Sequence, residues 1–384
     1  MVENVVGTVQ VPLGIATNFI INGREVLVPM AVEEPSVLAA ASNGAKLCRS
    51  TGGFVVTSSK PMMVGQVLIV SLEDVDAAHR DLEQREKEII DYANQKYPSL
   101  LKRGGGVKRV EPRKLDTSRG PMLVVHLHVD VCDSMGANAV TTIAEKVAPF
   151  LEKLTGGVAR MRILSNLCVD RVFTAEAVWR KKELEAKGLT GDEVVEAILD
   201  ASAFAEADEY RACTHNKGVM NGIDSVALAT LNDTRAIESG AHGFASVTGR
   251  YKPLTTYEKT PEGDLKGTIR VPLALGTRGG AIQSHPIASV NLKIMGADSG
   301  DELGKIMASV GLAQNFAAVR ALVTEGLSRG HMKLHAKNIA MSAGAKGDMV
   351  FVIAEMMSDE NNVSLERAKE LLAKADKQHG KLFY

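Results

Sequence analysis

The sequence has few aromatic residues and almost no net charge. Phe, Trp and Tyr make up 4% of its 384 residues, and 45 Lys and Arg against 46 Asp and Glu leave a net charge of −1. A basic surplus neutralises phosphates, and aromatic rings stack on unpaired bases. We therefore expect no nucleic-acid partner, and we interpret short basic runs such as 180–182 as solvated surface.

Cysteines and long apolar runs are also scarce. The four cysteines are widely spaced and form no Cys-x-x-Cys motif, which argues against a zinc site and a disulfide framework. No apolar run reaches the roughly 20 residues that a membrane helix needs. The first residues also lack the basic and apolar segments of a signal peptide. We expect a cytoplasmic protein with no metal centre and no membrane partner.

The first half of the chain alternates strand and helix patterns. Val140, Ile143, Ala144, Val147 and Leu151 recur at helical spacing before the glycines at 156–157. The expected elements are a strand at 65–72, a helix at 74–95, strands at 107–112 and 122–131, a helix at 136–154 and a strand at 158–164. This β-α-β-β-α-β order predicts a ferredoxin-like domain at about 58–167.

Residues 1–57 and 168–325 are then expected to form one larger mixed α/β domain, which the small one interrupts. Its second part predicts helices at 192–207 and about 301–328, with strands or short elements at 269–275 and 288–295. In the remaining residues, 326–384, we expect a helix from 330 to 343, a strand at 349–356 and a helix at 364–377. The fold class expected is therefore α+β.

Several familiar catalytic motifs are missing. The sequence has no G-x-G-x-x-G after a strand, no P-loop, no G-x-S-x-G and no H-E-x-x-H. A different turn, Asp133–Asn138, joins the strongest strand to the strongest helix. Gly136 would let a ligand approach the backbone, and the helix N-terminus attracts anions. The alternative is an ordinary turn with Asp133 as the N-cap.

The stretch 211–235 carries charged residues around an apolar run. Lys217 and Asp233 lie at the two ends of this run, and 223–230 is interpreted as a strand or buried segment. If the chain returns to one pocket, the ammonium and the carboxylate would tune each other. The alternative, a lysine in a surface turn with an unrelated aspartate, is the commoner case on spacing alone.

Two further motifs are compatible with acid–base chemistry. Pro35 and Ser36 begin a helix directly after Glu33 and Glu34, which are either a catalytic acid and its neighbour or simply favourable first-turn glutamates. His331 begins a helix after a glycine. With the histidine four residues later it offers two metal ligands and no evident third, so a mobile acid is the preferred interpretation.

Taken together and in this order, these stretches resemble hydroxymethylglutaryl-CoA reductase of the soluble bacterial and archaeal branch, class II. The similarity covers essentially the whole chain. The stretches that carry it are 3–7, 12–18, 29–36, 133–138, 163–167, 214–224, 276–280 and 330–335.

The resemblance implies a fold and a reaction. It implies a large CoA-substrate domain, an inserted ferredoxin-like nicotinamide-binding domain and a C-terminal helical flap. Two reduced nicotinamides, NADPH or NADH, would convert hydroxymethylglutaryl-CoA to mevalonate and free CoA, or the reverse. It also implies a homodimer or larger homo-oligomer, because active sites in this family form at a subunit interface.

The resemblance also assigns residues. Lys217 would stabilise the charge on the substrate oxygen, Asp233 would set the charge network of the site, and Glu34 rather than Glu33 would supply a proton. His331, on the flap, would protonate the departing CoA thiolate. Ser36, Arg211 and Asn221 would bind the hydroxymethylglutaryl group, and the nicotinamide site would comprise Asp133, Met135, Gly136, Asn138 and Asn166.

Two positions depart from the family pattern. Leu231 stands where a glycine is usual, which bears on the placement of Asp233. Together with the lack of the helical region that usually precedes 3–7, it motivates the alternative of a catalytically weak CoA- or nucleotide-binding protein. Tyr97 replaces the aspartate of NADH-preferring relatives, and Lys96, Lys102 and Arg103 lie near it, so the balance favours NADPH or dual use.

Overall fold

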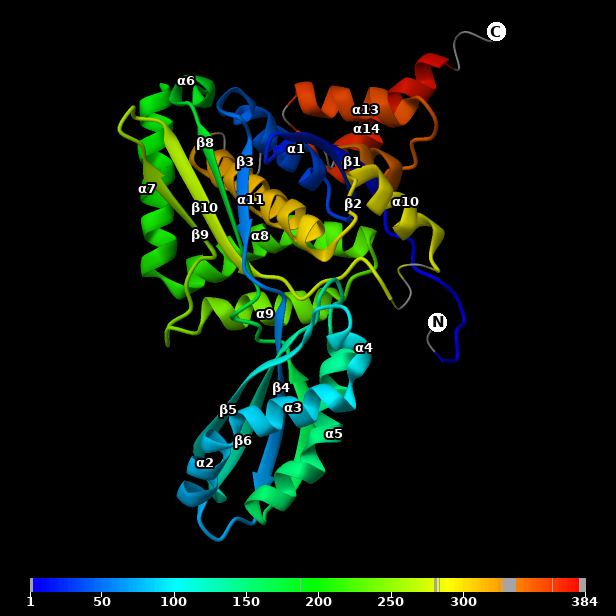
Figure 1. Cartoon of the computed structure of the whole chain (residues 1–384). Helices are drawn as coiled ribbons and strands as arrows, with labels where there is room; N and C mark the ends of the chain where they lie inside the picture. The colour runs from blue at the N-terminus through cyan, green and yellow to red at the C-terminus, as the bar shows by residue number, and fades with distance from the viewer. Residues whose placement is uncertain are drawn as a thin grey trace.

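Two β-sheets organise the chain into a large unit and a small unit (Figure 1). The computed structural model describes residues 3–186, 188–279, 282, 284–324, 326, 336–360 and 362–379. The small unit comprises the elements from β4 to β7, and the large unit comprises those before β4 and those from β8 to α11. Each unit has its own hydrophobic core. The mixed α+β class predicted from the sequence is confirmed.

The sheet of the large unit has six strands in the order β2-β1-β3-β8-β10-β9. Strands β1 and β3 pair in parallel, and the other neighbours pair antiparallel. Buried and half-buried residues alternate along β8, as expected for a strand with one face on the core. The strands are β1 (Leu13–Ile21), β2 (Arg24–Ala31), β3 (Phe54–Ser58), β8 (Val172–Trp179), β9 (Thr255–Lys259) and β10 (Leu265–Pro272).

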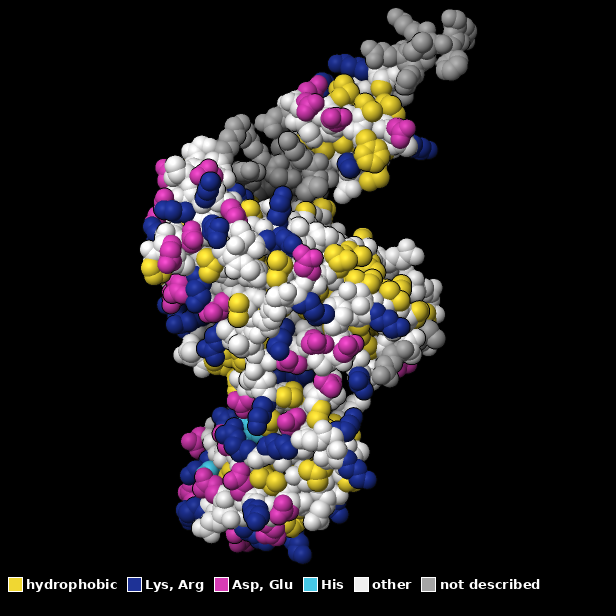
Figure 2. Space-filling view, turned by 45° about the horizontal axis from the view of Figure 1, so that its top comes forward, with side chains coloured by type: hydrophobic (Ala, Val, Ile, Leu, Met, Phe, Trp, Pro, Cys, Tyr) yellow, Lys and Arg dark blue, Asp and Glu magenta, His cyan; other side chains and the backbone are white. Residues whose placement is uncertain are grey.

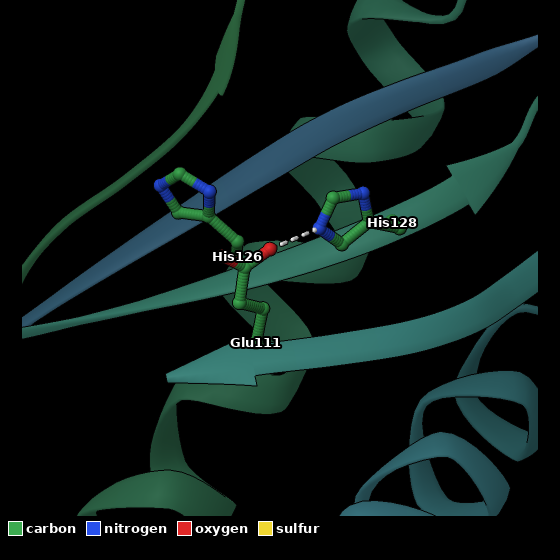
Figure 3. A group of neighbouring side chains, drawn as sticks. All are labelled: Glu111, His126 and His128. Carbon is green, nitrogen blue, oxygen red and sulfur yellow. Dashed lines mark hydrogen bonds and ion pairs between the residues drawn. The ribbon is translucent and has the colours of Figure 1, made fainter. Parts of the chain in front are cut away.

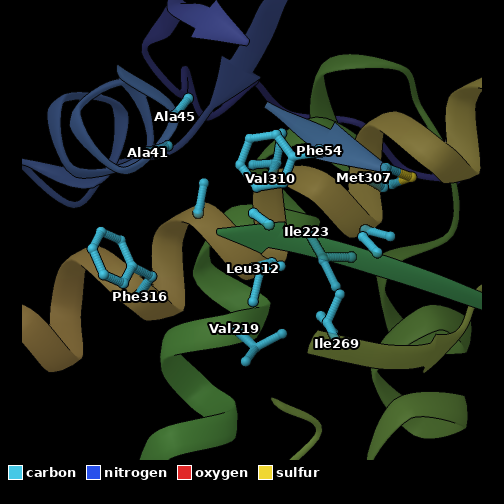
Figure 4. Close-up of a cluster of buried hydrophobic side chains, with 14 of the residues drawn as sticks. Ala41, Ala45, Phe54, Val219, Ile223, Ile269, Met307, Val310, Leu312 and Phe316 are labelled. Carbon is cyan, nitrogen blue, oxygen red and sulfur yellow. The ribbon is translucent and has the colours of Figure 1, made fainter. Parts of the chain in front are cut away.

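Three helices, α1, α8 and α11, pack together beside this sheet (Figure 4). Trp179 stacks on Phe316 with 3.9 Å between ring centroids, and its indole N–H donates to the Gly44 carbonyl. A Cβ at Gly44 would lie 2.4 Å from the Ala313 carbonyl oxygen, so glycine permits this crossing of α1 over α11. The helices are α1 (Val37–Leu47), η1 (Arg49–Thr51), α6 (Lys181–Leu184), α7 (Gly191–Ala207), α8 (Glu209–Ala229), α9 (Thr234–Ala245), α10 (Pro286–Met295) and α11 (Gly300–Thr324).

Helix α11 is long and apolar enough to cross a membrane by length and composition. In the structure 67% of its most apolar window is buried, and α11 packs on β3, β8 and β10. We therefore interpret it as the central core helix of the large unit.

The small unit has a four-stranded antiparallel sheet in the order β5-β6-β4-β7, with helices over one face. The predicted β-α-β-β-α-β order is confirmed, and the predicted apolar positions of α5 are buried. The predicted helix at 74–95 is interrupted at Arg85 and forms two helices. The elements are β4 (Met62–Val70), α2 (Val75–Gln84), α3 (Glu86–Lys96), α4 (Pro98–Leu101), β5 (Gly106–Thr117), β6 (Gly120–Asp130), α5 (Ala137–Thr155) and β7 (Val158–Ser165).

Three segments predicted as strands or short elements are helical. Residues 223–229 belong to α8, 288–295 to α10, and 349–356 to α13 (Met349–Asp359), which packs with α14 (Leu365–His379) around a third core. A short apolar run does not distinguish a buried strand from a buried helix. The capping residues show that two of these runs are helical, because Asp208 caps α8 and His285 with Pro286 begins α10.

The turn from α8 to α9 is a Schellman motif with Leu231 in its left-handed position, at φ 52°. The Leu231 N–H donates to Leu228 O, and the Asn232 N–H donates to Ala227 O at 2.8 Å. Leu231 stands where the family resemblance implies a glycine, and the structure shows that the turn forms with leucine. A branched side chain at this φ costs roughly 1 kcal/mol.

We predict that Leu231→Gly unfolds at a higher denaturant concentration than Leu231→Ala. Both variants lose the leucine side chain, which is 39% exposed, but only glycine relieves the left-handed strain. The difference in unfolding free energy should approach 1 kcal/mol, reduced by the greater chain entropy of unfolded glycine. Urea titrations of the two variants measure it, and an alanine variant as stable as the glycine variant would contradict it.

Candidate functional site

Five predicted site residues line one cavity of the large unit. The cavity has a volume of about 390 Å³ and lies between α1, α8 and α11. Most of its polar residues come from α8 and from the segment that leads into α1, and α11 forms the other wall with apolar residues and with Gln314 and Asn315. The predicted residues that line it are Glu34, Ser36, Arg211, Lys217 and Asn221.

Lys217 and Glu34 form an ion pair in this cavity. The Lys217 Nζ lies 2.8 Å from the Glu34 Oε2, and the Asn221 Nδ2 lies 3.4 Å from the same oxygen. Lys217 and Asn221 are four residues apart on α8, so their side chains project from one face of the helix. The Lys217 side chain is 60% exposed. The pair is therefore solvated in the single chain, and its electrostatic effect requires that the cavity be covered.

Buried polar residues on the other side of α8 hold Lys217 in place. The His215 Nε2 lies 2.5 Å from the Thr255 hydroxyl, which donates to the Asn315 Oδ1 at 2.8 Å. The Asn216 amide nitrogen donates to the Tyr251 hydroxyl and to a backbone carbonyl, and its amide oxygen accepts from a backbone N–H. Burial, followed by the Arg211 charge, lowers the pKa of His215 to about 4, so its imidazole is neutral. The sequence analysis did not identify these anchors.

The ends of the cavity fit an anionic group. Ser36 is the N-cap of α1 at φ 74°, and its hydroxyl donates to the Pro35 carbonyl. Arg211 lies in the first turn of α8, and burial lowers the pKa of its guanidinium. A partly desolvated guanidinium forms strong charge-assisted hydrogen bonds with a carboxylate.

A second cavity, of about 340 Å³, lies at the N-terminus of α5. Gly136 caps the helix at φ 100° with no side-chain hydrogen bond, so the first backbone N–H groups face the cavity. A Cβ at this glycine would lie 2.7 Å from Val131, which excludes larger residues. Met135, Gly136 and Asn138 line the cavity, as do two cations, Arg103 and Arg278.

Asp233 lines this second cavity, and not the one that holds Lys217 and Glu34. Its carboxylate caps α9 by accepting from the Ala236 N–H, and it pairs with Arg235 at 3.1 Å. The single chain therefore divides the predicted catalytic group between two cavities. His331 lies outside the described residues.

Two predicted nicotinamide residues do not line the second cavity. The Asp133 carboxylate accepts from the Gly300 N–H at the start of α11, at 3.3 Å, and Gly136, not Asp133, caps α5. The Asn166 carbonyl lies against Gly240 of α9. Both residues lie beside the cavity wall and contribute to the junction between the units.

Arg171 is a site-forming residue that the sequence did not reveal. It is 2% exposed, and its guanidinium donates to the carbonyls of Ser134, Met135 and Leu275. Burial lowers its pKa to about 10, so it stays charged at neutral pH. It thereby joins the turn before α5 to the segment that leads to Arg278. A single arginine before a strand carries no recognisable signal of this role.

Comparison with known proteins agrees with the geometry. The sequence model of the hydroxymethylglutaryl-coenzyme A reductase family matches residues 1–336. The reductase of Archaeoglobus fulgidus is 52% identical over 97% of this chain and 84% of its own length, and that of Pyrococcus horikoshii is 29% identical over 87% and 83%. The class II reductase of Streptococcus pneumoniae, solved bound to NADPH, superposes with a TM-score of 0.82 at 40% identity, covering 98% of this chain and 91% of that one.

The two-sheet fold and these matches define a nicotinamide-linked oxidoreductase. The chain belongs to the hydroxymethylglutaryl-coenzyme A reductase family, as a class II enzyme of the mevalonate pathway.

A half-buried acid on α8 has a raised pKa. Asp224 of α8 faces Glu238 of α9, and its Oδ1 has no hydrogen-bond partner. Burial, followed by the hydrogen bond and the charge of Glu238, raises the pKa of Asp224 to about 8. In the unfolded chain an aspartate has a pKa of about 3.9. Between these two pKa values the folded protein holds a proton that the unfolded chain has lost. The free energy of unfolding therefore falls as the pH rises through this range.

We predict that Asp224→Asn stabilises the protein at pH 8 relative to the wild type. The two proteins should unfold at similar urea concentrations near pH 4, and the variant should gain steadily as the pH rises towards about 8. Urea titrations across this range measure the difference. A constant offset between the two proteins at every pH would show that Asp224 is ionised in the fold and would refute the assignment.

Proposed function

We propose that this chain reduces (S)-3-hydroxy-3-methylglutaryl-CoA to mevalonate and CoA with two molecules of NAD(P)H, or catalyses the reverse oxidation. The observation that carries this assignment is the Lys217–Glu34 pair in a cavity that also contains Ser36, Arg211 and Asn221. This places a cation beside a carboxyl group that donates a proton when it is protonated, and hydride addition to a carbonyl requires both a cation and a proton donor.

The residues of this cavity have separate roles in the proposed reaction. Arg211, Ser36 and Asn221 bind the carboxylate and hydroxyl of the hydroxymethylglutaryl group, which places its carbonyl near Lys217. Bound reduced nicotinamide supplies the hydride. Lys217 stabilises the negative charge that develops on the substrate oxygen, and Glu34 supplies the proton that neutralises it. His331 protonates the departing CoA thiolate.

The second cavity is proposed to bind the nucleotide. The backbone N–H groups after Gly136 and the guanidinium groups of Arg103 and Arg278 suit a pyrophosphate and a further phosphate. Tyr97 also lines this cavity, where an aspartate would repel a 2′-phosphate. We therefore favour NADPH or dual use, and the Streptococcus pneumoniae relative was solved with NADPH.

The proposed domain boundaries follow the three cores. Residues 1–57 and 168–325 form the substrate domain, 58–167 the inserted ferredoxin-like nicotinamide domain, and 326–384 a helical flap. The support is that each of these parts has its own cluster of buried apolar residues.

We propose that a second copy completes each site. Lys217 and Glu34 line one cavity while Asp233 and the nucleotide residues line the other, so a partner chain would supply the missing half. The large unit also exposes an apolar surface for such a partner, and Figure 2 shows apolar side chains gathered on the large unit. This surface includes Leu13, Ile15, Ile287, Val290 and Ile294, each at least 38% exposed.

We predict that two inactive variants restore activity when mixed. Lys217→Ala and Asp233→Ala should each abolish oxidation of NADPH in the presence of hydroxymethylglutaryl-CoA. After unfolding and refolding together, half of the dimers are hybrids, and each hybrid has one site with both residues intact. Activity should recover to about a quarter of the wild-type value.

The control is each variant refolded alone, which should stay inactive. Full inactivity of the wild type with either nucleotide would overturn the proposed reaction. Inactive mixtures in which hybrids are shown by differently tagged subunits would overturn the shared site only.

We predict that Arg103→Ala weakens the use of NADPH and leaves the use of NADH nearly unchanged. Loss of a charge-assisted contact to the 2′-phosphate should raise KM for NADPH by about tenfold. Lys102→Ala is the matched control, because that neighbouring cation does not line the cavity. Parallel kinetics with both nucleotides measure the effect, and equal changes for NADPH and NADH would contradict it.

A further inference from the structure

Three potential metal ligands lie together on the small unit, away from both cavities. His126 and His128 are two residues apart on β6, so both imidazoles project from the same face of the sheet. Glu111 of β5 lies directly opposite His126 in the antiparallel register. The intervening Leu127 is buried in the core on the helix-covered side. Figure 3 shows the three side chains grouped above the two strands.

The distances suit a cation. One ligand atom from each residue lies within 4.8 Å of the other two, and the His128 Nε2 lies 3.1 Å from the Glu111 Oε2. Around a tetrahedral Zn²⁺ with bonds near 2.1 Å, ligand atoms are about 3.4 Å apart. Small side-chain movements therefore suffice to close the group. Two imidazoles and one carboxylate are a donor set that Zn²⁺ and its neighbours prefer.

Further side chains orient these ligands. The His128 Nδ1 lies 3.3 Å from the Asp170 Oδ2, and this carboxylate fixes the orientation of the ring with Nε2 on the side of Glu111. The Gln66 amide lies 2.9 Å from the His126 Nε2 and orients that ring. The His128 side chain is 5% exposed, so its imidazole has little freedom to turn away.

The guanidinium of Arg109 lies beside two of these ligands, where a metal cation would also be stabilised. The Arg109 Nη2 lies 2.9 Å from the His128 Nε2, 3.4 Å from the Glu111 Oε2 and 3.7 Å from the Asp170 Oδ2. Its side chain is 54% exposed, so it can move into solvent. A second guanidinium, that of Arg113, lies 3.5 Å from the His126 Nε2. Figure 2 shows histidines beside Lys and Arg at the end of the small unit nearest the large one.

We propose that Glu111, His126 and His128 form a binding site for a divalent transition metal of the Zn²⁺ class, with Arg109 as an internal competitor. Binding displaces the Arg109 side chain, and the metal takes over its contacts to Glu111 and His128. Asp170 lies in the segment that returns the chain from β7 to β8. The site therefore connects two strands of the small unit to the link between the units.

The test is calorimetric titration of ZnCl₂ into the chelator-treated full-length protein. All proteins carry Cys213→Ser, because Cys213 is an exposed thiol that binds Zn²⁺ itself. We expect one Zn²⁺ per chain. Glu111→Gln and His126→Gln should each weaken binding by about tenfold or more, whereas Arg109→Ala should strengthen it severalfold. His79→Gln is the matched control, because that histidine pairs with a carboxylate, Glu83, outside the group.

X-ray absorption of the Zn²⁺-loaded protein supplies a second measurement that does not depend on variants. A first shell with two imidazoles and oxygen supports the proposal, and sulfur in that shell overturns it. No binding by the wild type and by Arg109→Ala also overturns it, as does unchanged affinity in Glu111→Gln and His126→Gln. Thermal unfolding in chelator checks that each variant retains the fold.

Discussion

The cavity that contains Lys217 and Glu34 depends on the buried hydrogen bonds that anchor α8. His215 and Asn216 project into the core from the side of the helix opposite its exposed face, and they bond Thr255, Asn315 and Tyr251. A buried polar group without its partner costs about 1–3 kcal/mol, so the helix cannot rotate without losing several such bonds. This constraint fixes the rotation of α8 and with it the direction of Lys217. Lys217 is exposed because its two preceding neighbours are buried.

The same helix positions the second cavity. Helix α8 ends in the Schellman turn at Leu231, where the Asn232 Oδ1 accepts from the Gly276 N–H at 2.9 Å and Asp233 begins α9. Arg171 holds the opposite side of this cavity by its bonds to the turn before α5 and to Leu275. The walls of this cavity, at the junction of the units, are therefore held together by backbone carbonyls bonded to one buried guanidinium. Its geometry follows from the large unit as much as from the small one.

The sequence predicted the small unit well and the large unit unevenly. The apolar spacing of α5 and the β-branched run of β6 are local patterns, whereas 223–230 and 349–356 are short apolar runs whose periodicity is ambiguous. Glu34 and Lys217 are 183 residues apart, so only the family resemblance could associate them. Arg171 has no local signal. The His-x-His pattern at 126–128 was readable on a predicted strand, but its third member becomes visible only through the register with β5.

The exposure of Lys217 means that the proposed chemistry requires a covered cavity. An ion pair with a 60% exposed ammonium contributes at most about 1 kcal/mol in water. Stabilising a developing oxyanion requires about 3 kcal/mol or more, which a fixed charge supplies only where water is excluded. The single chain leaves the cavity of Lys217 open and directs Asp233 into a different one. In the proposed reaction, bound substrate and a second copy of the chain exclude this water, and the fixed charge of Lys217 then acts at full strength.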